Sequence, residues 1–234
     1  MKIIKNKILL SLVCVVAILV TTNFFAIKRL VEASSHTGLF TVVVDAGHGG
    51  IDGGVSGINS KVKESDLNLD IAKKLERKLF TAGVRVVMTR TSYGGLYGTT
   101  APGFKRRDMQ KRAKIINSAK ASALVSIHLN YYSQSSRRGA TTFYNPKSQQ
   151  GERLADVIQG QLNQLSGQTR EFSPLKGDYY LLNVADCPSV ICECGFLSNA
   201  EDEKLLLDEN YREEIANRIY LGVLSFLCSS DFPK

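Results

Sequence analysis

From Thr41 onward the chain alternates two hydrophobic patterns. Short apolar, β-branched runs typical of buried strands begin at Thr41 and recur at residues 84–90, 122–130, 139–144 and 189–194. Between them, apolar residues spaced three or four apart predict helices that include residues 67–79, 109–116, 154–165 and 215–226. Because strands alternate with helices and the strands are almost continuously apolar, we predict an α/β fold with a mainly parallel sheet covered by helices on both faces.

Local signals mark some of the boundaries. Ser65 is the expected N-cap of the first helix, and Gly83 follows the end of that helix. A glycine- and tyrosine-rich stretch at residues 91–103 predicts a loop.

The N-terminal residues carry a different pattern. Residues 8–26 contain no charged side chain, follow three lysines, and could form a helix close to the roughly 30 Å thickness of a membrane's hydrocarbon core. A small-residue pattern ending at Ala33 resembles a signal-peptidase site, whereas Lys28 and Arg29 resemble the flank of a retained helix. We therefore predict export, with a signal peptide or membrane anchor at 1–33, a linker at 34–40, one globular domain at 41–228 and a tail at 229–234.

Composition narrows the function classes. A chain of 234 residues with 44% hydrophobic and 22% charged side chains has room for one domain with a large core and is neither disordered nor collagen-like. The first 33 residues, with five basic side chains and one acidic, contribute +4 of the net charge of +8. The remainder is only mildly basic, so we expect no nucleic-acid partner. The five cysteines form neither a disulfide framework nor a zinc-ribbon pair.

Chemically capable residues lie at the ends of three predicted strands. Asp45 and His48 follow the first, His128 lies near the end of residues 122–130, and Glu193 lies in the last. The carboxyl ends of parallel strands share one edge of a sheet, where ligands commonly bind. Two histidines and a carboxylate are the protein ligands of many hydrolytic zinc sites. The spacing leaves four candidates for the carboxylate ligand: Asp45, Asp52, Glu64 and Asp66.

Glu193 lies in an apolar strand, where an unpaired ionised carboxylate is costly, so it requires either a buried ion-pair partner or a function. Strand periodicity places Cys192 and Cys194 on the opposite face from Glu193. A thiol hydrolase that uses Cys192 or Cys194 with His128 remains an alternative at this point. The motifs of serine hydrolases and phosphate-binding loops are missing from the sequence.

Four blocks carry a family resemblance. VVVDAGHGGIDGG at 42–54, Glu64 ahead of a helix, SIHLN at 126–130 and ECGFLSNAEDE at 193–203 resemble the zinc-dependent N-acetylmuramoyl-L-alanine amidases of the amidase-3 class. The resemblance runs from Thr41 to Leu227. It implies a mixed six-stranded sheet, with zinc held by His48, Glu64 and His128. It also implies that Glu193 takes a proton from the attacking water and passes it to the leaving amine.

The same resemblance implies the substrate and the setting. The reaction would cleave the amide between the lactyl group of muramic acid and L-alanine in peptidoglycan. A bare domain behind a membrane-targeting segment is similar to the germination-specific branch, which removes stem peptides ahead of muramic-δ-lactam formation in the spore cortex. Expected partners are peptidoglycan, a protein activator, and the membrane if the N-terminal segment is uncleaved. A catalytically silent peptidoglycan-binding module is the alternative from another class.

Overall fold

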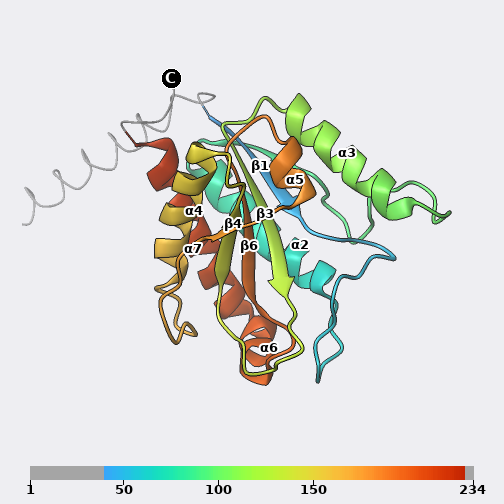
Figure 1. Cartoon of the computed structure of the whole chain (residues 1–234), viewed down its shortest axis with the longest axis vertical. Coiled ribbons are helices and arrows are strands. Elements are labelled where there is room, and N and C mark those ends of the chain that lie inside the picture. Colours follow the sequence, from blue (N-terminus) through green and yellow to red (C-terminus); the bar gives the residue numbers. More distant parts are fainter. Residues whose placement is uncertain (1–39, 230–234) are drawn as a thin grey trace, which may run out of the picture. The chain divides into compact units, whose positions relative to one another are not determined.

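A six-stranded sheet lies at the centre of the computed structural model, which describes residues 40–229 (Figure 1). The strand order is β2-β1-β3-β6-β4-β5, and all neighbours are parallel except β4 with β6. The strands are β1 (Thr41–Ala46), β2 (Arg85–Met88), β3 (Ala123–Asn130), β4 (Thr141–Tyr144), β5 (Leu175–Lys176) and β6 (Ser189–Phe196). The prediction of a mixed, mainly parallel six-stranded sheet is confirmed.

Helices cover both faces of this sheet. They are α2 (Glu64–Thr81), α3 (Phe104–Ser118), α4 (Gln149–Leu162), α5 (Tyr180–Val184), α6 (Ala200–Leu207) and α7 (Glu209–Leu227). The larger core cluster joins one face of the sheet to α2, α4 and α7, and a smaller one joins the other face to α3 and α5. Figure 1 shows α3 and α5 at the upper right of the strands and α4 and α7 to their left.

Strand alternation decides which side chains reach each face. In β3 and β6, Ile127, Cys192 and Cys194 belong to the larger core cluster. Their neighbours His128 and Glu193 point to the opposite face, and these two residues are paired directly across the β3–β6 ladder. The period-two pattern thus separates the apolar core from the face that carries the chemistry.

Several local features differ from the sequence prediction. Ser65 is not the N-cap of α2: the helix begins at Glu64, and Lys63 occupies the cap position without a side-chain cap hydrogen bond. The helix begins earlier because the backbone N–H of Glu64 is already bonded to Val55 O in the preceding loop. The short elements β5, α5 and α6 were not predicted, since a two-residue strand shows no alternation and helices of five and eight residues span too few turns to show a clear apolar repeat.

The predicted N-terminal membrane-targeting helix at 1–33, most of the 34–40 linker and nearly all of the 229–234 tail lie outside the described residues. Within residues 40–229, no helix is long and apolar enough to span a membrane. The proposed boundaries therefore stay predictions.

Candidate active site

A buried ion-pair network fixes the loop that follows β1. Arg112 of α3 donates to Asp45 Oδ1 at 2.6 Å and to Asp108 Oδ2 at 2.6 Å. The same guanidinium donates to the carbonyl oxygens of Ala46 at 2.7 Å and His48 at 2.5 Å. All three charged side chains are buried, and the contacts of Arg112 with Asp45, Ala46 and His48 hold the segment that leads to His48.

A second arginine ties this loop to the start of α2. Arg90 donates to the carbonyl oxygens of Ala46, Gly47 and Ser65 at 2.8–2.9 Å. His48 then adopts a φ of 61°, a left-handed conformation that is uncommon for a residue with a Cβ and that often occurs at functional sites. The backbone is therefore held in a strained form that brings the His48 ring next to Glu64, the first residue of α2.

His48, Glu64 and His128 form one cluster. Glu64 Oε1 lies 3.3 Å from His48 Nε2 and 3.1 Å from His128 Nδ1. One potential ligand atom from each of the three residues lies within 4.8 Å of the others. The three side chains come from the loop after β1, the first turn of α2 and the end of β3. Such a set of two imidazoles and one carboxylate suits a zinc ion and leaves room for a further ligand.

Backbone groups and glycines shape this cluster. Glu64 accepts hydrogen bonds from the N–H groups of Val55 at 2.9 Å and Leu129 at 3.1 Å, so its carboxylate is fixed in one orientation. A Cβ at Gly47 would lie 2.3 Å from the His128 ring, and one at Gly54 would lie 2.3 Å from Glu64 Oε2. Both positions require glycine because the functional side chains pass directly over the backbone.

The electrostatics of the cluster favour an ionised carboxylate. Although burial alone would raise the pKa of Glu64, contacts with His128 and His48 lower it well below its usual value. Burial alone would lower the pKa of His48, but Glu64 and Asp52 outweigh burial and raise it. A divalent cation held by both imidazoles would satisfy the same negative charge.

The other candidate carboxylates have different surroundings. Asp45 is paired with Arg112, and Asp66 Oδ1 accepts a hydrogen bond from Ser65 Oγ. Asp52 Oδ2 lies 3.1 Å from His48 Nδ1, on the ring edge away from Glu64. Asp52 thus lies within ion-pair distance of the His48 ring, a contact that the sequence did not reveal because only the loop geometry brings the two together.

Glu193 faces the cluster from β6. Burial raises its pKa to about 7; His128 and His48 oppose this shift, and Glu64 adds to it. Its Oε2 atom is buried and has no hydrogen-bond partner among the described residues. The expected alternative, a buried ion pair with a basic side chain, is therefore wrong. A carboxylate with a buried, unpartnered oxygen and a pKa near neutrality is suited to general acid–base chemistry.

The cysteines do not take part. Cys192 and Cys194 are buried in the core cluster on the opposite face of the sheet, and burial raises the pKa of both thiols far above the usual range. A thiolate is the reactive form, so neither cysteine can act as the nucleophile toward a substrate near His128. The thiol-hydrolase alternative is wrong. All four cysteines in the described residues are free.

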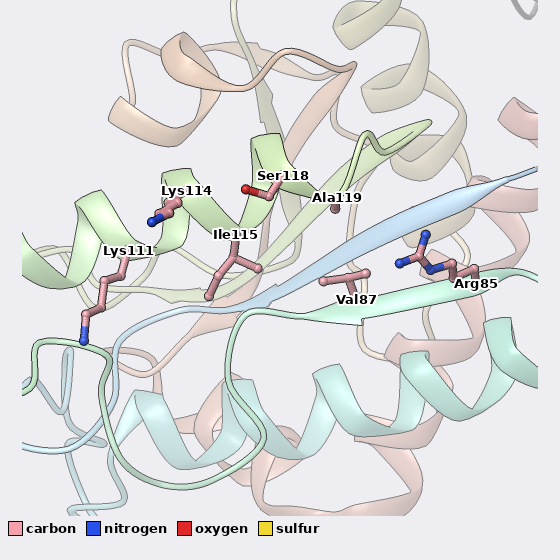
Figure 2. Close-up of a pocket in the computed structure, with 7 residues that line it drawn as sticks. All are labelled: Arg85, Val87, Lys111, Lys114, Ile115, Ser118 and Ala119. Atoms are coloured by element: carbon pink, nitrogen blue, oxygen red, sulfur yellow. The ribbon is translucent and has the colours of Figure 1, made fainter.

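A pocket of about 410 Å³ opens over the cluster. Besides His48, Glu64, His128 and Glu193, its lining includes three tyrosines that sequence reasoning missed: Tyr131, Tyr179 and Tyr180. A separate hollow of about 460 Å³ lies between α3 and β2. Figure 2 shows the residues that line it. Its lining has no carboxylate, imidazole or thiol, so it does not compete as the catalytic site; the residues are Arg85, Val87, Lys111, Lys114, Ile115, Ser118 and Ala119.

Comparison with known proteins decides the family. A family model described as N-acetylmuramoyl-L-alanine amidase matches residues 42–225, almost the whole of the described domain. This chain belongs to that amidase family. The amidase is 35% identical over 196 residues to the germination-specific N-acetylmuramoyl-L-alanine amidase of Bacillus subtilis (strain 168), a match that covers 82% of this chain and 81% of the relative.

Solved structures of related amidases share the fold. The CwlD amidase from Clostridioides difficile, solved in complex with the GerS lipoprotein, is 39% identical with a TM-score of 0.76, covering 80% of this chain and 98% of that one. The catalytic domain of CwlV from Bacillus (Paenibacillus) polymyxa var. colistinus is 30% identical with a TM-score of 0.72, covering 81% and 98%. This chain is therefore an N-acetylmuramoyl-L-alanine amidase of the cell wall. Its family is generally zinc-dependent, which agrees with the His48–Glu64–His128 cluster.

Because of the Asp45–Arg112 ion pair, we predict that the domain becomes less stable at acid pH. Although burial alone would raise the pKa of Asp45, Arg112, Ser126 and Thr89 lower it from 3.8 to about 2. Because the folded-state pKa is depressed, the stabilisation is fully present above pH 3.8 and is lost as the pH falls toward 2. We expect the free energy of unfolding in urea to fall by about 2 kcal/mol over this window. In Asp45→Asn this part of the pH dependence should disappear; an unchanged slope would contradict the assignment.

The close approach at Gly47 predicts a defect confined to the site. In Gly47→Ala the added methyl would overlap the His128 ring, so the imidazole must move away from Glu64. We expect zinc affinity, measured by competition with a chelator, to fall roughly tenfold or more. Gly160→Ala in α4 is the matched control, since a Cβ there has no atom within 4 Å and should leave zinc affinity unchanged. Equal zinc affinity in the two variants would count against His128 as a zinc ligand.

Proposed function

We propose that this chain hydrolyses the amide between the lactyl group of N-acetylmuramic acid and L-alanine, with His48, Glu64 and His128 as zinc ligands and Glu193 as the catalytic residue. One observation supports these roles above all. The His48–Glu64–His128 cluster and Glu193, whose Oε2 atom is buried without a partner among the described residues, line the same pocket. The pair of proximate imidazoles, the ionised Glu64 and the two glycines beneath them fit a zinc ion.

Each residue has a distinct task in this proposal. Zinc, when bound, polarises the scissile carbonyl and makes water a better nucleophile. Glu64, fixed by two backbone N–H groups, and His48, oriented by Asp52, keep the ligand geometry rigid. Glu193 takes a proton from the attacking water on its free Oε2 and donates it to the amine nitrogen as the C–N bond breaks.

We further infer a role in the spore cortex and an exported location. The relative from Bacillus subtilis is named germination-specific, and it matches this chain over most of both lengths. Removal of stem peptides would prepare the glycan for muramic-δ-lactam formation. The apolar segment at residues 8–26 would direct the domain across the membrane, as a signal peptide or as a retained anchor.

We also infer a protein activator. The solved CwlD amidase was captured in complex with the GerS lipoprotein, which supports a partner of similar kind for this chain. With three protein ligands and a partly exposed site, zinc affinity depends on how well the surrounding residues hold the ligands. A partner that stabilises this arrangement would raise the zinc occupancy.

Zinc content and stem-peptide release test the proposal together. The fragment from Ser35 to Lys234 is incubated with purified peptidoglycan, with and without added zinc, a chelator or iodoacetamide. We expect release that requires about one zinc per chain, stops with the chelator and resists iodoacetamide. A folded, zinc-loaded fragment that co-sediments with peptidoglycan but releases no peptide would instead identify a binding module.

A further inference from the structure

Exposed aromatic residues gather beside the candidate pocket. Among the large hydrophobic side chains exposed in residues 40–229, several come from just two segments, 131–132 and 175–180: Tyr131, Tyr132, Leu175, Tyr179 and Tyr180. Three of them, Tyr131, Tyr179 and Tyr180, line the same pocket as Glu193. Single apolar side chains scattered over a protein surface are common, whereas a group of them beside a pocket is typical of a binding site.

The α5 side of this aromatic group is held rigidly. The Tyr179 ring packs edge-on against Phe143 of β4, with the ring centroids 5.4 Å apart. Gly177 passes so close to Tyr179 that a Cβ there would lie 2.5 Å from the ring. Leu181 and Leu182 of α5 are buried and fix the short helix to the domain.

The β3 side is held in a similar way. The N–H of Tyr131 donates to Asn130 Oδ1 at 2.8 Å, and the N–H of Tyr132 donates to Ser198 Oγ at 3.0 Å. The Arg137 guanidinium lies 3.8 Å from the Tyr132 ring centroid. Because both segments are ordered in advance, a ligand that contacts their rings would lose little binding energy to ordering them.

The hydrolytic chemistry does not account for these rings. Burial and the negative charge of Glu193 raise the pKa of Tyr179, so its hydroxyl stays protonated at neutral pH. What the three tyrosines offer is flat apolar faces with polar hydroxyl groups at the rim. A pyranose ring has the complementary form, with C–H bonds on its faces and hydroxyl groups around its edge.

We propose that Tyr131 and Tyr180, together with Tyr179, bind the pyranose ring of the muramic acid residue whose amide is cleaved. The inference rests on the amidase function and adds its sugar specificity. The sugar is remote from the scissile bond, so its binding energy serves to position the amide against Glu193 and the ligand cluster. The amidase should therefore discriminate against the same amide when the sugar ring is missing.

Two substrates separate sugar binding from catalysis. One is an N-acetylmuramoyl peptide, and the other is a D-lactoyl peptide, which has the same scissile amide without the pyranose ring. The fragment from Ser35 is suitable because the CwlV catalytic domain, of which the match covers 98%, was solved as a separate domain. For Tyr131→Ala and Tyr180→Ala, we expect kcat/KM on the muramoyl peptide to fall about tenfold, mostly through KM. On the lactoyl peptide, kcat/KM should be unchanged.

Two variants serve as controls. Tyr180→Phe keeps the ring and should retain most of the activity. Phe80→Ala removes an aromatic side chain that is 74% exposed at the end of α2 and does not line the pocket, so it should behave as wild type. Equal losses on both substrates, or no loss on the muramoyl peptide, would overturn the sugar-binding role.

A binding measurement separates this proposal from the proposed catalytic roles. In a Glu193→Gln background, titration calorimetry with the uncleaved muramoyl peptide should show about tenfold weaker binding when Tyr180→Ala is added. The lactoyl peptide should bind both proteins equally. If Glu193→Gln still turns over substrate, the catalytic assignment fails, whereas unchanged affinity after Tyr180→Ala removes the sugar-binding proposal alone.

Discussion

Replacing Glu193 with glutamine should reduce stem-peptide release about a thousandfold while leaving zinc bound. The amide keeps the shape of the side chain but can neither accept a proton from water nor pass it to the leaving amine. Glu193 lies outside the ligand cluster, so zinc content measured by metal analysis should stay near that of the wild type. Loss of zinc in Glu193→Gln would identify the residue as a ligand and contradict its assignment as the proton-transfer group.

The fold should tolerate this change. Glu193 is half-buried, but its Oε2 atom is fully buried and has no hydrogen-bond partner among the residues that the structure describes, so a neutral amide removes the cost of burying a charge without a partner. We expect the melting temperature of Glu193→Gln to equal or exceed that of the wild type. Glu171→Gln is the matched control, because it removes an exposed carboxylate that does not line the pocket. That variant should retain full activity.

Replacing His128 with alanine should remove zinc and activity together. Two of the three proposed ligands would remain, and we expect zinc affinity to fall roughly a hundredfold or more, with peptide release at background level. Loss of the imidazole ring leaves a gap next to Glu64. His128 is partly exposed and contributes little to the core, so the domain should still fold. Zinc content and circular dichroism on the same sample test both expectations.

His36→Ala is the matched control for this experiment. His36 is the remaining histidine of the chain besides His48 and His128, and it lies outside the described residues. The fragment from Ser35 contains it. The variant therefore tests whether the loss of a histidine outside the cluster also lowers zinc retention. We expect normal zinc content and activity. A folded His128→Ala protein that still holds one zinc per chain would exclude His128 as a ligand.

The sequence by itself determined the fold class and the face of the sheet that carries the chemistry. Apolar runs and three-to-four-residue spacing are local properties, so the strands and long helices are visible in the sequence. Period-two alternation separates Glu193 from Cys192 and Cys194 without any tertiary information. The positions of His48 and His128 at strand ends likewise follow from the pattern, because parallel strands deliver such residues to one edge.

The choice among carboxylates could not come from these patterns. Spacing left Asp45, Asp52, Glu64 and Asp66 equivalent, and only the family resemblance singled out Glu64. Glu64 and His128 are 64 residues apart, and their contact exists because α2 starts beside the end of β3. Asp45 is similarly committed to Arg112, which is 67 residues away. Contacts between such distant residues depend on how whole elements pack, which local periodicity does not encode.

Tertiary structure alone decided the surroundings that give these residues their properties. The placement of Asp52 on the His48 ring, the free Oε2 of Glu193 and the tyrosines around the pocket all arise from loops and from the five-residue helix α5. Short segments carry little periodic signal, and a pKa depends on burial and on charges brought in from other elements. The sequence therefore determined which residues could react, and the packing of distant segments decided which of them meet.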